Sequence, residues 1–407
     1  MLTSSRPALA LILSTAGLAL ASCGYETTGD GGRDAVSTPA PQQGVVQGPF
    51  RVTEHGTFTR PWAGAFEPGT GRLFVTERPG TLKLVDPATG TATTVSGTPQ
   101  VDFGGQGGLG DIAFAPDYAR SRAIYLSWAE AGENDTRGAV VGRGTLACSG
   151  SDCRIEGLKI IWRQAPKVTG RGHYSHRIVF SPDGTHMFVA SGDRQKMDPA
   201  QDNANTLGTI VRLNLDGTPA AGNPIAANPE IWSYGHRNIL GMAFDPQGRL
   251  WEVEHGPAGG DELNLVKPGL NYGWPVVSDG DHYDGKAIPD NDTRPDLAKP
   301  ALGWTPVIAP GNMIIYGGDR FGAWKGQALI SGLSSKALVR VTFDGEGARE
   351  AERYAFDKRL RAVVEGPDGA LWVLEDGEGA RLLRAGSGKL IQPPAKVKFI
   401  DSHPRRS

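Results

Sequence analysis

The stretch FSPDGTHMFVASGD, residues 180–193, decides the fold because variants of it recur along the chain. An apolar strand enters, a Pro-Asp-Gly turn reverses the chain, and a second apolar run pairs back antiparallel. Further copies, the last one degenerate, lie at 66–77, 114–128, 244–256, 365–376 and 318–333. Because one such hairpin cannot bury both faces, six copies predict an all-β, six-bladed propeller of four-stranded antiparallel blades. A β-sandwich with duplicated hairpins is the alternative.

The composition agrees with many short strands joined by tight turns. The 407 residues include 57 Gly and 29 Pro, yet 39% are hydrophobic, which is enough for a core and argues against wholesale disorder. The formal net charge of -2 gives no general attraction for nucleic acid or for an anionic membrane surface. Partners must therefore be recognised at local sites.

The N-terminus has the pattern of an export signal. Arg6 precedes an apolar run that is too short to span a membrane, and the run ends in Leu-Ala-Ser-Cys. This ending resembles a bacterial lipobox, which implies that Cys23 carries a lipid anchor; a plain signal peptide is the alternative. We expect export to the bacterial cell envelope, with membrane attachment only through that lipid. The expected segments are a lipoprotein-type signal peptide (1–22), a tether (23–45), a propeller (46–390) and a C-terminal tail (391–407).

Without Cys23, two cysteines remain, Cys148 and Cys153 in CSGSDC. In an oxidising compartment an even pair at short spacing favours a local disulfide. A metal site is the less favoured alternative, because no histidine or second cysteine pair lies nearby in the sequence.

His173, in RGHYSHRIVF, stands immediately before one of the repeat strands. An imidazole there can accept a proton near neutral pH if a carboxylate orients its other nitrogen. Asp193 ends the same hairpin, and two strands and a turn bring the chain back to the edge where it started. The alternative is a structural histidine.

Two further clusters carry groups suited to an anionic, planar ligand. Arg237 and Asn238 follow a Tyr-Gly turn before another repeat, where a salt-bridged turn is the alternative. Arg359 and Arg361 alternate along a strand, so both side chains face one side and need an anion or bulk water. Their position before the last repeat predicts that they lie at the channel mouth.

The segment WEVEHGPAGGDELNLVKPGLNYGWP, residues 251–275, is rich in oxygen ligands. Backbone carbonyls in Gly-Pro turns and nearby carboxylates suit calcium rather than zinc, although the spacing is not that of an EF-hand. The glycine-rich loop around Gln106 has no helix behind it, which argues against a nicotinamide dinucleotide.

Taken together, GQGGLGDIAFAPDYA, GHYSHRIVFSPDG, LGTIVRLNLDGTPAAGNP, IWSYGHRNILGMAF and EHGPAGGDELNLVKPGLNYGWP resemble a known family. It is the soluble aldose sugar dehydrogenases that depend on pyrroloquinoline quinone (PQQ), relatives of soluble quinoprotein glucose dehydrogenase. The resemblance spans about residues 50–385 and implies a six-bladed propeller. It also implies oxidation of an aldose sugar at the anomeric carbon to a lactone, by hydride transfer to PQQ, with electrons passed on to an unidentified acceptor.

The resemblance also implies site residues. His173 corresponds to the general base and Asp193 to its orienting carboxylate. The carbonyls of Gly256 and Pro257 correspond to ligands of a catalytic calcium, and Glu262 and Tyr272 to a second calcium position. The residues implied to hold PQQ are Gln106, Arg237, Asn238, Tyr283, Gly332, Leu333, Ser334, Arg359, Leu360 and Arg361.

The sequence departs from the family at two points. Ser334 stands where the family has a lysine, which leaves one cofactor cation missing or displaced, and Ile239-Leu240 replace a common Pro-Gln pair. Two other functions therefore stay in view: a non-catalytic sugar-binding or interaction propeller, and a calcium-dependent hydrolase such as a lactonase. The second lacks the ring of acidic and Asn ligands that its metal would need.

Overall fold

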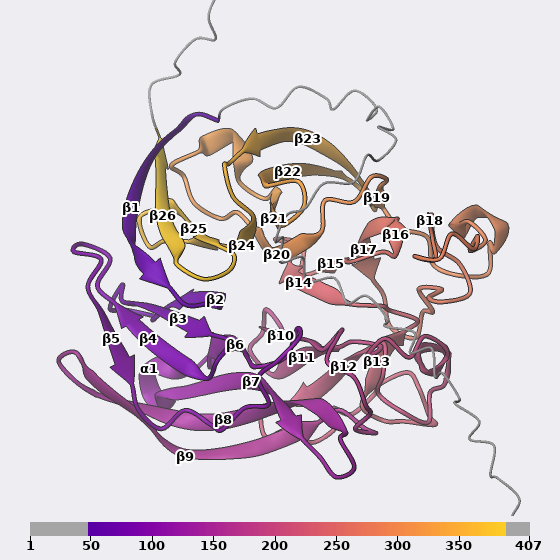
Figure 1. The fold of residues 1–407 in the computed structure, drawn as a ribbon, viewed down its shortest axis with the longest axis horizontal. Helices are drawn as coiled ribbons and strands as arrows, with labels where there is room; N and C mark the ends of the chain where they lie inside the picture. Colours follow the sequence, from indigo (N-terminus) through magenta and orange to yellow (C-terminus); the bar gives the residue numbers. More distant parts are fainter. Residues whose placement is uncertain (1–47, 388–407) are drawn as a thin grey trace, which may run out of the picture. The chain divides into compact units, whose positions relative to one another are not determined.

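Six four-stranded antiparallel sheets form the framework of the computed structural model, which describes residues 48–387 (Figure 1). The six-bladed propeller predicted from the repeats is thereby confirmed. All described residues belong to one compact unit, Thr38–Ser407. The predicted signal peptide, the anchor residue Cys23, the tether and the tail 391–407 lie outside the described residues.

We number the blades along the chain and order their strands from the innermost outward. Blade 1 consists of β2 (Pro61–Phe66), β3 (Leu73–Glu77), β4 (Thr81–Val85) and β5 (Ala92–Val95). Blade 2 consists of β6 (Leu109–Phe114), β7 (Ala123–Ala131), β8 (Arg137–Ser149) and β9 (Asp152–Arg163). Blade 3 consists of β10 (Ser175–Phe180), β11 (His186–Ser191), β12 (Thr209–Asn214) and β13 (Ile231–Tyr234). Blade 4 consists of β14 (Ile239–Phe244), β15 (Leu250–Glu254), β17 (Asp261–Val266) and β19 (Leu302–Trp304). Blade 5 consists of β20 (Pro310–Ile315), β21 (Ala328–Gly332), β22 (Ala337–Asp344) and β23 (Gly347–Ala355). Blade 6 consists of β24 (Leu360–Glu365), β25 (Leu371–Glu375), β26 (Ala380–Ser387) and β1 (Phe50–Phe58).

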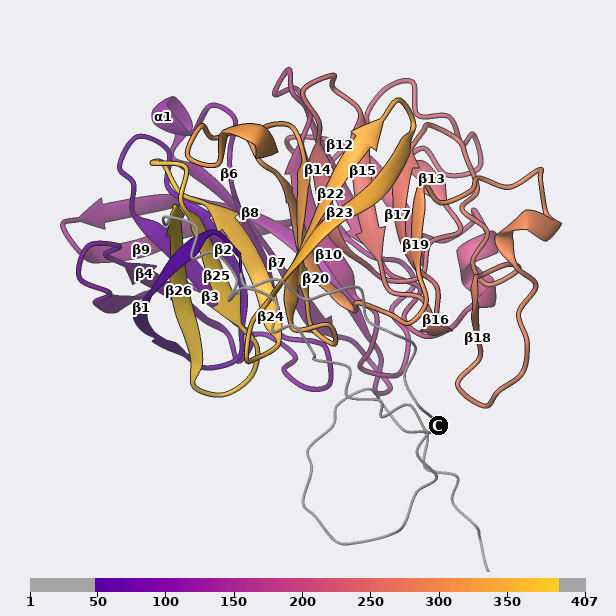
Figure 2. The same cartoon turned by 90° about the horizontal axis from the view of Figure 1, so that it is seen from above.

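The remaining elements are short. They are the two-stranded ribbon β16 (Ala258–Gly259) and β18 (Gly280–Asp281), the helix α1 (Tyr118–Ser121), and 3-10 turns at Asp198–Gln201, Asn291–Thr293 and Gly322–Trp324. Figure 2 shows the blades from the side, with loops at both ends of the strands. Within residues 48–387, no helix is long and apolar enough to cross a membrane.

The six innermost strands, β2, β6, β10, β14, β20 and β24, contact one another in a closed ring. The ring closes in blade 6, where β1 from the start of the described chain pairs with β26 from its end, from Phe50↔Ser387 to Phe58↔Ala380. Closure of this kind leaves only short, protected sheet edges. It also fixes the loops at one end of the ring relative to one another.

The repeated turn has the same geometry in three blades. In β10–β11 the N–H of Gly184 donates to the carbonyl of Ser181 at 2.8 Å, and Gly248 and Gly369 close the corresponding turns at 2.9 and 2.8 Å. All three glycines have φ between 69° and 77°, a region that favours glycine. In blade 2 the turn is replaced by α1, which explains why that repeat lacks the glycine.

Apolar clusters fill the spaces between neighbouring blades. One cluster joins Phe74 of blade 1 to Ile124 of blade 2, and five others continue around the ring to Trp372 of blade 6 and Leu73 of blade 1. Burial between the blades, rather than within any one of them, therefore stabilises the ring.

Each innermost strand has a register shift near its first residue, for example between Ser175 and Ile178 in β10 and between Leu360 and Ala362 in β24. Such bulges bend a strand and redirect its side chains. The first residues of the six innermost strands therefore lie at the end of the propeller where bulges redirect side chains.

Cys148 and Cys153 are directly opposite in the β8–β9 pair and form a disulfide, as predicted. We expect the double substitution Cys148→Ser, Cys153→Ser to lower the free energy of unfolding by about 2 kcal/mol, because the bond closes a short loop in the unfolded chain. Urea unfolding of the double variant and the wild type, each with and without reductant, measures this. An unchanged midpoint would show that the hairpin holds without its cross-link.

Candidate functional site

His173 and Asp193 lie together where blade 3 begins. β10 starts two residues after His173, and β11 ends two residues before Asp193. Because the two strands are antiparallel neighbours, the side chains return to one edge, and His173 Nδ1 lies 2.7 Å from Asp193 Oδ1. Both residues are buried. The hairpin thus brings together the two side chains that the sequence paired.

The shared hydrogen bond leaves the second nitrogen of His173 available. Burial lowers the pKa of His173, and the charge of Arg237 lowers it further, against the opposing effect of Asp193. Burial alone would raise the pKa of Asp193, but the interaction with His173 holds it below its usual value. At neutral pH an ionised Asp193 therefore accepts the Nδ1 proton, and Nε2 carries the lone pair of a general base.

The loop that carries His173 has an unusual backbone. His173, Ser175 and His176 have φ of 47°, 55° and 49°, in the left-handed region that side chains other than glycine rarely adopt. The N–H of His173 donates to Gln106 Oε1 at 2.7 Å, so blade 2 holds the loop from the other side. Strain of this kind persists only where the surroundings impose it, often at functional sites.

Arg237 lies between blade 4 and two aromatic rings. Its guanidinium donates to the carbonyl of His255 at 3.0 Å and to the Tyr283 hydroxyl at 3.2 Å, and it lies 5.1 Å from the centre of the Trp274 ring. Its Nε is buried and has no hydrogen-bond partner among the described residues. Asn238 accepts a hydrogen bond from Ser175 at 3.3 Å. The bond from Ser175 to Asn238 thus places the pair beside the His173 loop.

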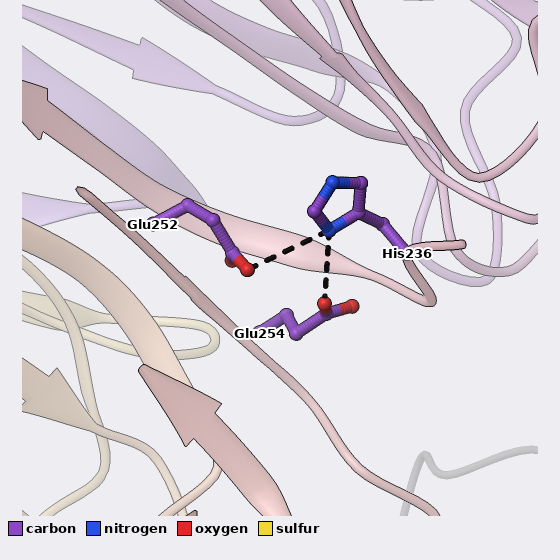
Figure 3. Close-up of side chains that lie close together, drawn as sticks. All are labelled: His236, Glu252 and Glu254. Carbon is purple, nitrogen blue, oxygen red and sulfur yellow. Dashed lines mark hydrogen bonds and ion pairs between the residues drawn. The ribbon is translucent and has the colours of Figure 1, made fainter. Parts of the chain in front are cut away.

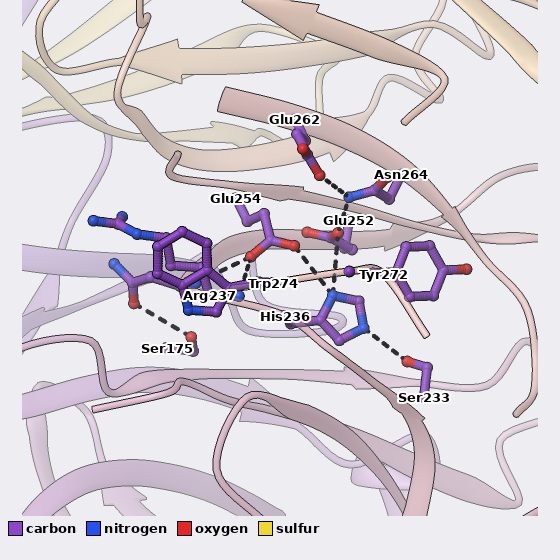
Figure 4. A network of polar contacts seen from close by, with 12 residues as sticks. Ser175, Ser233, His236, Arg237, Glu252, Glu254, Glu262, Asn264, Tyr272 and Trp274 are labelled. Atoms are coloured by element: carbon purple, nitrogen blue, oxygen red, sulfur yellow. Dashed lines mark hydrogen bonds and ion pairs between the residues drawn. The ribbon is translucent and has the colours of Figure 1, made fainter. Parts of the chain in front are cut away.

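Glu254 fixes the backbone of this pair (Figure 4). Its Oε2 accepts hydrogen bonds from the N–H groups of Arg237 at 2.5 Å and Asn238 at 3.1 Å. Its Oε1 lies 3.1 Å from His236 Nδ1, and the His236 ring stacks on Tyr272. The orientation of Arg237 is therefore set by a buried carboxylate and not by the loop alone.

His236, Glu252 and Glu254 have the spacing of a metal-ligand group (Figure 3). Burial opposes a charge on His236, but its bonds to Glu252 and Glu254 raise its pKa to about 9. Burial and the charge of Glu254 raise the pKa of Glu252 to about 8. An imidazolium that donates from Nδ1 to Glu254 at 3.1 Å and from Nε2 to Ser233 Oγ at 2.9 Å satisfies both ring nitrogens without a metal, while Glu252 lies farther from Nδ1, at 3.6 Å.

Arg359 and Arg361 share one anion, Asp376, which the sequence analysis missed. Arg359 Nε lies 3.0 Å from Asp376 Oδ2, and Arg361 Nε lies 2.9 Å from Oδ1. Burial acts to raise the pKa of Asp376, but the two guanidinium groups outweigh it and lower the pKa to about 2. The anion that these like charges need is therefore partly supplied by the chain itself, with one carboxylate between two cations.

The turn after β15 presents two bare carbonyls. Within residues 48–387, no hydrogen bond is accepted by the carbonyl oxygen of Gly256 or Pro257. A Cβ on Gly256 would lie 2.1 Å from the carbonyl oxygen of Gly259, so only glycine fits there. Asp261 holds the turn by accepting the N–H of Gly256 at 2.9 Å. These oxygens have the chemistry of a hard-cation site.

The two residues assigned to a second calcium adjoin the His236 cluster: the Tyr272 ring stacks on His236, and Glu262 lies opposite Glu254 across β15 and β17. Glu262 accepts hydrogen bonds from Asn291 at 3.0 Å and Asn264 at 3.3 Å. The Tyr272 hydroxyl is engaged by the backbone: it donates to the carbonyl of Leu265 at 2.6 Å and accepts from the N–H of Lys267 at 2.8 Å. Only the main-chain oxygen of Tyr272 is therefore available to a cation.

The remaining predicted residues differ in exposure. Leu333 is buried, and its N–H donates to the carbonyl of Ala309 at 2.7 Å. Ser334 is exposed, with its hydroxyl 3.1 Å from the carbonyl of Val307. Leu360 is buried at the start of β24, Gly332 ends β21, and Tyr283 is 63% exposed beside Arg237.

The model of the family described as "Glucose / Sorbosone dehydrogenase" matches residues 58–384. The chain belongs to the glucose/sorbosone dehydrogenase family. The match covers all six blades except residues 50–57 of β1 and residues 385–387 of β26.

Three known proteins are similar to the chain. The aldose sugar dehydrogenase YliI of Escherichia coli is 37% identical over 333 residues, which cover 80% of this chain and 89% of that protein. A crystal structure of a glucose dehydrogenase is 40% identical, with a TM-score of 0.79, and covers 83% of this chain and 100% of its own. The PQQ-bound aldose sugar dehydrogenase of Streptomyces coelicolor is 30% identical, with a TM-score of 0.69, over 83% and 98%.

Besides Asp376, two side chains at this site were missed. Trp274 hydrogen-bonds Asp193, and Arg78 donates to the carbonyls of Gly105 and Gly107, on either side of Gln106. Burial and the charge of Arg361 lower the pKa of Arg78 to about 10. Arg78 and Asp376, like Asp193, follow the second strand of a repeat hairpin, and that shared position was the signal in the sequence.

Proposed function

We propose that this member of the glucose/sorbosone dehydrogenase family is a quinoprotein that oxidises aldose sugars at the anomeric carbon to lactones. The observation that carries the proposal is the buried His173–Asp193 pair, set beside Arg237 and Asn238 at one end of the propeller. The PQQ bound to the Streptomyces coelicolor relative supports the choice of cofactor.

In this proposal His173 Nε2 accepts the proton of the anomeric hydroxyl. Asp193 holds the imidazole in the required tautomer and stabilises the imidazolium that forms. Because the hydroxyl loses its proton to His173 and the anomeric carbon loses a hydride, the sugar gives up two electrons and becomes the lactone. PQQ, when bound, supplies the two-electron acceptor for that hydride.

The residues present fit an anionic quinone. Among residues 48–387 the buried Nε–H of Arg237 has no hydrogen-bond partner, and the Arg361 and Asp376 side chains beside each other are 12% and 17% exposed. Planar guanidinium groups match carboxylates in geometry and charge. Arg237, Asn238, Gln106, Arg359 and Arg361 would hold the cofactor, and the exposed ring of Tyr283 would cover its edge.

Calcium fits the bare carbonyls of Gly256 and Pro257, which we propose as its protein ligands. Calcium takes six to eight oxygen ligands, so two carbonyls alone leave positions for cofactor and water oxygens. When bound, it supplies Lewis-acid polarisation next to the cofactor. We also propose Glu262 and the Tyr272 carbonyl for a second calcium with a structural role.

Reconstitution tests the proposal. Purified protein freed of metal by chelator is mixed with PQQ and calcium, and then assayed with glucose and an artificial dye acceptor. We expect dye reduction that requires both additions and is lost when calcium is removed again. The proposal would be refuted if no aldose tested gave either dye reduction or a change in the PQQ spectrum.

A non-catalytic sugar-binding propeller is the second candidate. Ser334 favours it, because an exposed hydroxyl bonded to a carbonyl stands where the family has a lysine. Binding of a sugar in the same assay without any dye reduction would favour this candidate over the enzyme.

We further propose export and lipid attachment at Cys23. The Cys148–Cys153 disulfide supports export, since such bonds persist in oxidising compartments. We expect Cys23→Ala to move the protein from the membrane fraction to the aqueous fraction of cells, while Cys148→Ser stays with the membrane. Detergent phase partitioning measures this, and an unchanged distribution of Cys23→Ala would contradict the anchor.

A further inference from the structure

We propose that Trp274 is a positioning residue for the reaction: it holds the Asp193 carboxylate against His173 and packs on Arg237, which ties the base to the cofactor site. The inference rests on the proposed function. Trp274 is not one of the residues that the family resemblance assigned, and its contacts in the structure carry the argument.

The two oxygens of Asp193 are divided between two tasks. Oδ1 accepts hydrogen bonds from His173 Nδ1 at 2.7 Å and from the N–H of Gln195 at 2.8 Å. Oδ2 accepts the indole N–H of Trp274 at 2.8 Å and a longer bond from the N–H of Met197 at 3.3 Å. Asp193 is fully buried, so the indole is the main donor that satisfies Oδ2.

The indole reaches Asp193 from a neighbouring blade. Trp274 follows β17 of blade 4, whereas Asp193 follows β11 of blade 3. The main chain of Trp274 is fixed at both polar groups: its N–H donates to the carbonyl of Gly235 at 2.9 Å, and its carbonyl accepts from Gln201 Nε2 at 2.7 Å. The bond to Asp193 is therefore made by a side chain with little freedom to move away.

The same ring contacts the cofactor side of the site. The guanidinium carbon of Arg237 lies 5.1 Å from the centre of the Trp274 ring, within the range of a cation–π interaction (Figure 4). Trp274 is 7% exposed, so little water separates the two groups. The Trp274 side chain thus contacts both Asp193, which orients the base His173, and Arg237, the candidate cation for a cofactor carboxylate.

Loss of the indole N–H has a chemical consequence that loss of packing lacks. A donor on Oδ2 withdraws charge from the carboxylate, so its removal leaves more negative charge to face His173. The charged and titratable groups that face His173 are Asp193, Arg237, Arg194 and His255. Of these groups only Asp193 favours the imidazolium. A more negative Asp193 carboxylate therefore raises the pH at which His173 is protonated.

Trp274→Phe is the test variant, because it keeps an aromatic ring over Arg237 and removes the N–H. Trp304→Phe is the matched control: the Trp304 indole donates to Glu350 at 2.7 Å at the outer edge of blade 4 and not to Asp193. Its main chain pairs with Asp261, and a side-chain substitution leaves that strand pairing in place. Both are loaded with PQQ and calcium and assayed with glucose and dye from pH 5 to 9. We expect Trp274→Phe to lose roughly tenfold in kcat, the size of one hydrogen bond to a charged group.

The pH profile separates positioning from packing. We expect the acidic limb of kcat/KM to move to higher pH in Trp274→Phe and to stay in place in Trp304→Phe, while the Kd for PQQ changes little in either. Wild-type kcat and an unmoved limb in Trp274→Phe would overturn the inference. Absence of activity in the wild type would instead overturn the proposed function.

A second variant covers the case in which Trp274→Phe does not fold. Benzothienylalanine at position 274 keeps the bicyclic shape and lacks the N–H donor. The same loss of kcat and the same shifted limb are expected, and wild-type behaviour of this variant would overturn the inference.

Discussion

Replacing His173 with alanine is expected to lower kcat about a hundredfold to ten-thousandfold, the range by which a general base accelerates proton transfer. His173 is the buried imidazole whose Nδ1 is committed to Asp193, which leaves Nε2 to accept the proton of the sugar. PQQ binding is expected to persist, because in this account the cofactor is held by the guanidinium groups. Steady-state kinetics with glucose and dye, alongside a PQQ titration, measure both quantities.

His186→Ala is the control for this substitution. His186 lies at the other end of β11, where it bonds Thr185, and it is expected to leave kcat unchanged. Because burial and the charge of Arg237 lower the pKa of His173, wild-type kcat/KM should rise with pH along a limb centred below the usual histidine value. Full turnover by His173→Ala would remove this residue as the base.

Replacing Arg237 with alanine is expected to raise the Kd for PQQ by roughly thirtyfold to several thousandfold, which corresponds to about 2–5 kcal/mol for the loss of one partner of a buried charge pair. The fold should persist, because Glu254 accepts hydrogen bonds from the backbone N–H groups of residues 237 and 238, and these bonds do not depend on the side chain at position 237. A fluorescence or absorbance titration with PQQ measures the Kd.

Arg212→Ala is the matched control. Arg212 also lies over a tryptophan ring, 4.4 Å from Trp232, and also has a buried Nε without a partner among the described residues, but it lies in β12 on the outer side of blade 3. Its loss should leave the Kd for PQQ unchanged. Equal affinity in Arg237→Ala and the wild type would show that the cofactor binds elsewhere.

The sequence predicted the fold through one local pattern. The hairpin turns recur because Gly184, Gly248 and Gly369 adopt the same left-handed backbone, and a local pattern repeated six times leaves few architectures. The same reasoning placed Asp193 beside His173, since a strand, a turn and an antiparallel strand end where they began. Both predictions depend on contacts between residues close in sequence.

One contact that escaped prediction lies between two blades. Trp274 meets Asp193 across 81 positions of sequence, from blade 4 to blade 3, and no local pattern encodes that approach. Asp376 was within reach, because it ends its hairpin as Asp193 does. The alternation of Arg359 and Arg361 implied an anion, and the end of the partner strand, where Asp376 stands, was the nearest place for it. Arg78 ends the first hairpin in the same way.

A single turnover without dye tests whether this chain transfers a hydride from an aldose to PQQ. Protein loaded with PQQ and calcium is mixed anaerobically with glucose, and the absorbance of the cofactor and the sugar product are followed together. We expect one equivalent of reduced cofactor and one equivalent of lactone, with both formed far more slowly in His173→Ala. Cofactor that binds tightly and stays oxidised with every aldose, and no lactone, would contradict it.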